Sequence, residues 1–310
     1  MRIKEIDYLK GVLIVLMVLF HLVYIGDSYP YAKRIIYSFH MPAFLIISGY
    51  LTNIDKTPRA FARSMMWILI PYAVMECCYI AGASFFPIRE HIDNLTAGVF
   101  LDKLLLHPLG LYWYLHTLAL CSTAWYIIVC RTEKFDLTGR IILCGMLLYL
   151  LSCWKIVNFA HAVYYIIGAT IHKQGLSFGN IFKPNVLCLL PIPFLCCSDE
   201  LKHSSVEGYA MTYFMMCSLL LFYKWKVASF FTFLGRNTLS VVLFSPLFTL
   251  LAKSFLPLLL SIDSSGILFA AVAVAFALAG CFLIAIIMDY CKITRYFIGK
   301  ERLFQHPAFQ

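Results

Sequence analysis

The feature that most constrains this chain is a series of long apolar runs with almost no charge. The longest, residues 266–289, contains a single charged side chain, Asp289, at its end. A helix needs about 20 apolar residues to cross the hydrocarbon core of a bilayer. Hydrophobic residues make up 62% of the sequence and charged residues 13%, which leaves too little polar surface for a soluble domain. We therefore expect an all-α, polytopic transmembrane helical bundle.

The apolar runs also indicate how the chain is divided into spans. A β-barrel would need many short strands with alternating residues, and these runs are too long and continuous for that. The fifth and sixth spans are short, so we expect them to be tilted or buried within the bundle. About ten spans are expected, and they cover residues 7–25, 35–52, 64–84, 109–129, 140–154, 158–172, 184–198, 208–223, 237–256 and 266–289.

Loop charges predict the orientation of the bundle, because cytoplasmic loops carry an excess of lysine and arginine. One alternate set of loops is the more basic, and it includes Lys56, Arg63, Arg140 and Lys224. Both termini are therefore expected in the cytoplasm, in agreement with an even number of spans. The net charge of +9 resides in these short loops, so it does not indicate a nucleic-acid partner.

Nothing in the sequence predicts a second domain. It has no linker, repeat or low-complexity segment, so we expect residues 1–310 to form one integral-membrane domain. No small-residue cleavage site follows the first run, so a cleavable signal peptide is not expected. Most of the 12 cysteines lie in apolar runs, where cysteine acts as a small hydrophobic residue, and a disulfide framework is not expected.

Two ionisable residues share the first span. Lys10 and His21 are eleven residues apart, and at about 100° per residue this spacing brings them to the same side of a helix. They are expected to stand about 16 Å apart along its axis. With the amino terminus inside, Lys10 lies near the cytoplasmic face and His21 in the outer half of the bilayer. Asp7, one turn before Lys10, has the spacing of a local ion pair.

Other ionisable residues follow the same division by depth. His40 in the second span and His116 in the fourth are expected near the depth of His21, whereas Arg63 and Arg236 are expected near the cytoplasm. Ionisable residues inside membranes are rare and usually functional, and imidazole transfers protons near neutral pH. A histidine can also simply hydrogen-bond a neighbouring helix, and Lys10 can extend to the interface to set topology.

Two other kinds of site are not expected. The sequence has no His-x-x-x-His pair and no nearby carboxylate partner for the histidines at outer depth, so no metal site is predicted. Ser48 lies two turns deeper than His40, which does not favour a serine triad. We expect Ser48 to pack with Gly49 at a close helix contact instead.

These residues occur in a series of motifs. In the first fifty residues, Asp7-Tyr-Leu-Lys10 precedes His21 and the stretch Tyr37-Ser-Phe-His40-Met-Pro follows. Weaker landmarks come later in the chain: Ile70-Pro71-Tyr72, Leu111-Tyr-Trp113-Tyr-Leu, and Phe233-Leu-Gly235-Arg236-Asn237-Thr238-Leu. Together the motifs resemble the acyltransferase-3 family of membrane O-acyltransferases. The resemblance covers the whole chain and is most specific in the first fifty residues.

The resemblance implies a function. Members transfer an acetyl or similar acyl group from cytoplasmic acyl-CoA, such as acetyl-CoA, to a hydroxyl of a cell-surface or exported glycan or lipid-linked sugar. It implies a multi-pass protein of the bacterial plasma membrane with no permanently bound cofactor and no metal. His21 matches the catalytic histidine and His40 lies in the second matched motif. The residues assigned to substrate binding are Lys10, the matched basic partner, with Asp7, Arg63, Trp113 and Arg236.

The sequence departs from the family pattern at two places. Trp67 stands where relatives commonly carry an arginine, and Ser245-Pro246 replaces a histidine before a proline. Some larger relatives also carry an extracytoplasmic esterase-like domain, which we do not expect here. Two other classes of function stay open on the residues alone. One is a transporter or channel with a histidine proton relay, and the other is a structural membrane partner.

Overall fold

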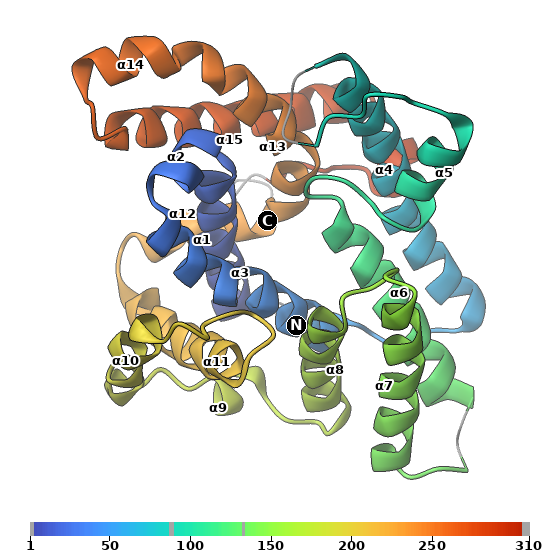
Figure 1. Ribbon diagram of the computed structural model, residues 1–310. Helices are drawn as coiled ribbons and strands as arrows, with labels where there is room; N and C mark the ends of the chain where they lie inside the picture. Colours follow the sequence, from blue (N-terminus) through green and yellow to red (C-terminus); the bar gives the residue numbers. More distant parts are fainter. Residues whose placement is uncertain (1–2, 87–89, 132–133, 306–310) are drawn as a thin grey trace. The chain divides into compact units, whose positions relative to one another are not determined.

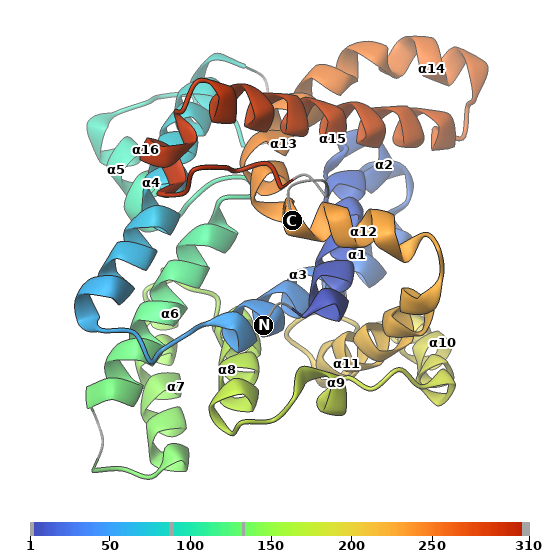
Figure 2. The same cartoon turned by 180° about the vertical axis from the view of Figure 1, so that it is seen from behind.

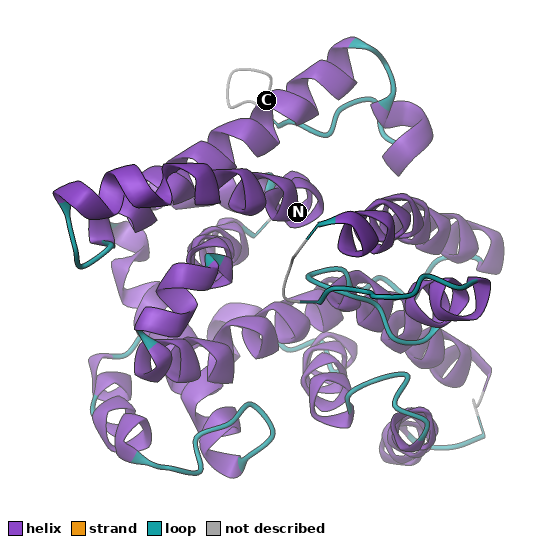
Figure 3. Ribbon diagram, turned by 45° about the horizontal axis from the view of Figure 1, so that its top comes forward, coloured by secondary structure: helices purple, strands orange, loops and turns teal. Residues whose placement is uncertain are grey.

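The computed structural model describes residues 3–86, 90–131 and 134–305, and every regular element among them is a helix (Figures 1 and 3). The expected all-α class is therefore confirmed. The helices are α1 Lys4–His21, α2 Val23–Ser28, α3 Pro30–Leu51, α4 Pro58–Phe85, α5 Ala97–Leu105, α6 Trp113–Arg131, α7 Leu137–Cys153, α8 Phe159–Lys173, α9 Phe178–Ile181, η1 Val186–Leu189, α10 Pro191–Cys197, α11 Val206–Leu221, η2 Phe222–Lys224, α12 Ala228–Arg236, α13 Thr238–Ala252, η3 Lys253–Phe255, α14 Leu256–Ile262, α15 Ile267–Tyr290 and α16 Thr294–Ile298.

Four stretches of helix among the described residues are long and apolar enough to cross a membrane. They are Pro58–Phe85, Val206–Lys224, Thr238–Ile262 and Ile267–Tyr290. Every one of the ten expected ranges contains helix. The count of ten spans and the location of the termini stay predictions.

The helices form two compact units. The first contains Met1–Phe44, Leu176–Arg295 and Lys300–Gln310, and the second contains Leu45–Gly175 and Tyr296–Gly299. The division falls inside α3. In the first unit α1 packs against α12, α13 and α15, and α13 packs along α15; these labels can be followed in Figure 2. In the second unit α6 packs against α4, α7 and α8.

The first expected span is not one helix. Residues 7–25 were expected to be continuous, but α1 ends at His21 and α2 begins at Val23. Leu22 between them has the extended conformation, with φ −66° and ψ 109°, and it breaks the helical hydrogen-bond series. Leu22 is buried in a cluster with Phe20, Ile25 and Phe269, so burial of its side chain offsets the broken turn. His21 is consequently the last residue of α1.

Two glycines let α1 and α12 approach until their backbones touch. A Cβ atom on Gly11 would lie 1.8 Å from the carbonyl oxygen of Phe231, and one on Gly235 would lie 1.6 Å from the carbonyl oxygen of Asp7. Real Cβ atoms do not come so near a backbone atom. Close helix crossings of this kind use small residues because lipid tails supply no hydrophobic force between helices, so association depends on contact and hydrogen bonds.

The second unit repeats this arrangement where α3 crosses α8. A Cβ atom on Gly49 would lie 2.1 Å from the carbonyl oxygen of Tyr165, and one on Gly168 would lie 1.9 Å from that of Ile46. The expected close contact at Gly49 is confirmed. Ser48 beside it shares a 2.6 Å hydrogen bond with the Tyr114 hydroxyl, which gives this serine a structural partner.

We expect Gly11→Ala and Gly235→Ala to destabilise the protein by about 1–3 kcal/mol each, because the added methyl group forces the two helix backbones apart. Thermal unfolding in detergent measures this loss. Gly145→Ala is the matched control, since a Cβ atom there meets nothing within 4 Å, and alanine favours the helix. Equal unfolding temperatures for Gly235→Ala and Gly145→Ala would contradict the close crossing.

Candidate active site

His21 ends α1 with its imidazole in a defined tautomer. Its Nδ1 lies 2.7 Å from the carbonyl oxygen of Met17, one turn earlier. A carbonyl oxygen only accepts, so Nδ1 carries the proton and donates it. The other ring nitrogen, Nε2, then has a free lone pair. The side chain of His21 is half-buried, so the packed helices do not enclose it completely.

His40 on α3 has the same arrangement in a more enclosed place. Its Nδ1 donates to the carbonyl oxygen of Ile36 over 2.8 Å, and the residue is only 2% exposed. Its Nε2 is buried and has no hydrogen-bond partner among the residues that the structure describes. A buried polar atom without a partner is costly. The geometry therefore provides two imidazoles that each keep Nε2 available.

Tyr37 joins the two histidines into one group. Its ring centroid is 5.9 Å from that of His21 and 5.1 Å from that of His40. Its hydroxyl donates to the carbonyl oxygen of Phe20 over 3.2 Å, which attaches α3 to the end of α1. Tyr37 and His40 are three residues apart and so share one face of α3. We call His21, Tyr37 and His40 the histidine group.

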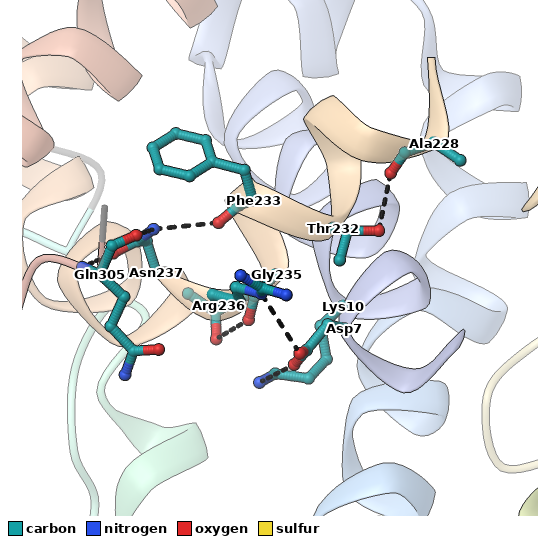
Figure 4. Close-up of polar contacts among 10 residues, drawn as sticks. Asp7, Lys10, Ala228, Thr232, Phe233, Gly235, Arg236, Asn237 and Gln305 are labelled. Atoms are coloured by element: carbon teal, nitrogen blue, oxygen red, sulfur yellow. Dashed lines mark hydrogen bonds and ion pairs between the residues drawn. The ribbon is translucent and has the colours of Figure 1, made fainter. Parts of the chain in front are cut away.

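A cluster of three charged residues lies towards the other end of α1 (Figure 4). One oxygen of Asp7 is 3.7 Å from Nζ of Lys10 and the other is 3.9 Å from Nε of Arg236. The expected ion pair between Asp7 and Lys10 is confirmed. Asp7 is 4% exposed, so it acts as a buried anion between two cations. The formal charges of these three residues sum to +1.

The Gly235-Arg236-Asn237 landmark ends α12, and each of its residues has a separate contact. Gly235 allows the close approach of α1, and Arg236 pairs with Asp7. The Asn237 side chain accepts from the Gln305 backbone N–H over 2.8 Å and donates to the Gln305 carbonyl over 3.3 Å. Figure 4 shows Asn237 and Gln305 next to the charged cluster. The landmark therefore fixes α1, a cation and the carboxyl-terminal segment together.

The other predicted substrate-binding residues belong to the second unit. Arg63 is exposed on α4. Trp113 stacks on His161, with ring centroids 4.5 Å apart and an interplanar angle of 16°. In the same unit, Nε2 of His116 lies 3.0 Å from the carbonyl oxygen of Leu105, so this histidine donates a hydrogen bond to the end of α5. The roles of Arg63 and Trp113 stay predictions.

Sequence reasoning did not single out Tyr37 or Glu76. Tyr37 was quoted only within a motif, although its spacing from His40 was a usable signal. Glu76 is fully buried within α4, where one carboxylate oxygen accepts from the Leu109 N–H over 2.7 Å and the other has no hydrogen-bond partner in the described part of the chain. The rarity of acids in spans would have identified it.

Over the described residues 3–86, 90–131 and 134–305, no three histidine, cysteine, aspartate or glutamate side chains group as metal ligands would. The chemistry that this arrangement offers is therefore that of imidazole lone pairs near one end of α1 and of cations near the other.

Comparison with known proteins places the chain in a family. A family model described as an acyltransferase domain matches residues 3–286. The nodulation protein NolL of Sinorhizobium fredii (strain NBRC 101917 / NGR234) is 28% identical over 256 residues, which is 75% of this chain and 57% of that protein. NolL of Mesorhizobium japonicum (strain LMG 29417 / CECT 9101 / MAFF 303099) is 35% identical over 129 residues, 37% of this chain and 32% of that protein.

The chain thus spans little more than half the length of the curated relatives it matches. No solved structure matches it. The family match covers almost the whole chain and includes residues of both units, as well as the motifs of the histidine group and the charged cluster. The chain belongs to the acyltransferase-3 family.

Proposed function

We propose that this chain is a membrane O-acyltransferase of the cell membrane. It moves an acetyl or similar acyl group from cytoplasmic acyl-CoA to a hydroxyl of a cell-surface or exported glycan. The observation that carries the proposal is the histidine group, in which both imidazoles donate through Nδ1 to a carbonyl of their own helix and keep Nε2 free. A general base or a nucleophile needs that free nitrogen.

The proposed reaction uses His21 at the reacting atoms. As a general base, Nε2 takes the proton of the acceptor hydroxyl while the hydroxyl oxygen attacks the thioester carbonyl carbon. The carbon–sulfur bond then breaks, and the CoA thiolate leaves and takes up a proton. As a nucleophile, the same Nε2 attacks the thioester carbonyl carbon, and the carbon–sulfur bond breaks to release the CoA thiolate. The acyl group then passes from Nε2 to the acceptor hydroxyl, whose proton is taken up by the thiolate or by water. Both routes require the tautomer that the Met17 carbonyl selects.

The charged cluster is proposed to hold the donor. CoA carries phosphates, and Lys10 and Arg236 offer ammonium and guanidinium donors that suit them. Asp7 keeps these two cations together, and the net charge of +1 supports an anionic ligand. Lys10 and His21 lie on one helix, about 16 Å apart by helical rise. An extended pantetheine arm of acyl-CoA fits such a separation.

His21→Ala is expected to lower acyl transfer by about 10²–10⁴-fold, because it removes the proton acceptor or nucleophile. The measurement is mass spectrometry of surface glycans from cells that make the wild-type protein or the variant. The matched control is His172→Ala, since His172 is an exposed histidine at the end of α8. Full glycan acylation in cells that make the His21→Ala variant would contradict the proposal. A transporter with a histidine relay would instead give substrate flux in proteoliposomes without acyl-CoA consumption.

Lys10→Met and Arg236→Gln are each expected to raise the KM for acyl-CoA about tenfold, because a charge-assisted hydrogen bond to a phosphate is worth about 1.5–3 kcal/mol. Steady-state kinetics with acetyl-CoA measure the change, which should shrink as ionic strength rises. Lys224→Met is the control, since Lys224 is an exposed basic residue of η2. An equal rise in KM for Lys224→Met would show a general surface-charge effect and contradict a specific donor site.

A further inference from the structure

An open cavity lies beside Tyr37 of the histidine group, where α2 meets the start of α3. Its volume is about 420 Å³, and it is lined by Gly26, Asp27, Pro30, Lys33, Arg34 and Tyr37. Tyr37 also contacts the rings of His21 and His40. A molecule in this cavity therefore lies against the same aromatic ring as the two imidazoles. We call it the α2–α3 cavity.

The charged residues of the α2–α3 cavity are of both signs. Lys33 Nζ is 3.5 Å from Asp27, and Arg34 is 3.7 Å from Asp199. The Asp27 side chain is 56% exposed and that of Asp199 is fully exposed, whereas Lys33 is 21% exposed and Arg34 is 33% exposed. Exposed ion pairs contribute little and exchange partners readily. A ligand can therefore replace one partner in each pair at small cost.

The cavity also keeps unused hydrogen-bonding capacity and aromatic surface. Nε of Arg34 is buried without a hydrogen-bond partner among the described residues. Lys33 Nζ lies 5.7 Å from the Tyr37 ring centroid, and the Arg34 guanidinium lies 5.3 Å from that of Tyr31. These contacts hold the two cations beside flat apolar faces. The walls thus combine donors, one carboxylate acceptor and rings.

This mixture selects one class of ligand. A hydroxyl group both donates and accepts, so adjacent hydroxyls can satisfy Asp27 and the two cations at once. Asp27 and Asp199 balance the charges of Lys33 and Arg34, so the four charges sum to zero and give an anionic group no net attraction. An apolar group would desolvate the charges without replacing their hydrogen bonds. The volume is within the usual range of small-molecule sites, about 300–1,000 Å³.

A neighbouring cavity shares Asp27 with the α2–α3 cavity. Its volume is about 330 Å³, and Leu22, Tyr24, Leu256 and Phe269 are among its walls. Asp27 therefore lines both cavities. Only the α2–α3 cavity of these two contains Tyr37 and so reaches the histidine group.

We propose that the α2–α3 cavity is the acceptor subsite and that it binds a neutral, hydroxyl-rich sugar unit. Asp27 accepts hydrogen bonds from the sugar, Lys33 and Arg34 donate to it, and Tyr37 supports its apolar face. The sugar then presents a hydroxyl towards Nε2 of His21. The role of this cavity as an acceptor subsite rests on the proposed acyl transfer. Sugar binding in the cavity can be measured without any turnover.

The test measures binding of p-nitrophenyl hexosides and p-nitrophenyl glucuronide to the purified protein in detergent by saturation-transfer NMR and titration. Wild-type protein is expected to bind a neutral hexoside more tightly than the glucuronide. Asp27→Asn and Lys33→Met are each expected to weaken hexoside binding about tenfold, because each loses a charge-assisted hydrogen bond. Asp55→Asn and Lys173→Met, both at exposed positions, are the matched controls and should bind as the wild type does.

Three results would overturn the subsite: no hexoside binds, the glucuronide binds more tightly, or the Asp27 and Lys33 variants bind as their controls do. Asp27 is largely exposed, so Asp27→Asn keeps the test informative if Lys33→Met does not fold. A separate result bears on the proposed function. Hexoside binding that responds to Asp27→Asn, with no acetyl-CoA consumed, would reject acyl transfer and retain the sugar site.

Discussion

The contact on which the first unit depends is the crossing of α1 and α12, where backbone meets backbone at Gly11 and Gly235. Because the Asp7 carbonyl lies against Gly235, the Asp7 carboxylate is within reach of Arg236, the next residue of α12. Asn237 then attaches the carboxyl-terminal segment through Gln305. A small residue at one position thus determines where a charge pair forms. The charged cluster is a consequence of helix packing as much as of electrostatics.

Both histidines obtain their tautomer from the helix itself. An imidazole base in a soluble enzyme is commonly oriented by a carboxylate, but a carboxylate at membrane depth is expensive. Here the carbonyl oxygens of Met17 and Ile36, one turn before each histidine, accept the Nδ1 proton instead. This arrangement adds no charge to the apolar interior. It also explains how both imidazoles keep one tautomer without a carboxylate to orient them.

The sequence could predict those features that depend on neighbouring residues in the chain or on composition. The all-α class followed from long uncharged runs, the Asp7–Lys10 pair from helical spacing, and the close contact at Gly49 from the small residue itself. It could not predict the break at Leu22, because burial among Phe20, Ile25 and Phe269 outweighs the regular helix there. Nor could it predict that Tyr37 contacts His21, since that contact joins two helices. Trp113 matched a motif and Arg63 was expected as a cation near the cytoplasm, but both lie in the second unit.

The break at Leu22 links the histidine group to the α2–α3 cavity. If α1 continued to residue 25, the segment 23–28 would extend along the helix axis, and Asp27 would lie about 9 Å beyond His21 by helical rise. The extended Leu22 instead starts a new short helix, α2, whose residues Gly26 and Asp27 line a cavity together with Tyr37 of α3. One non-helical residue therefore ends α1 at a histidine and places the α2–α3 cavity against the ring that this histidine contacts. Its position after His21 connects the proposed base to the proposed acceptor.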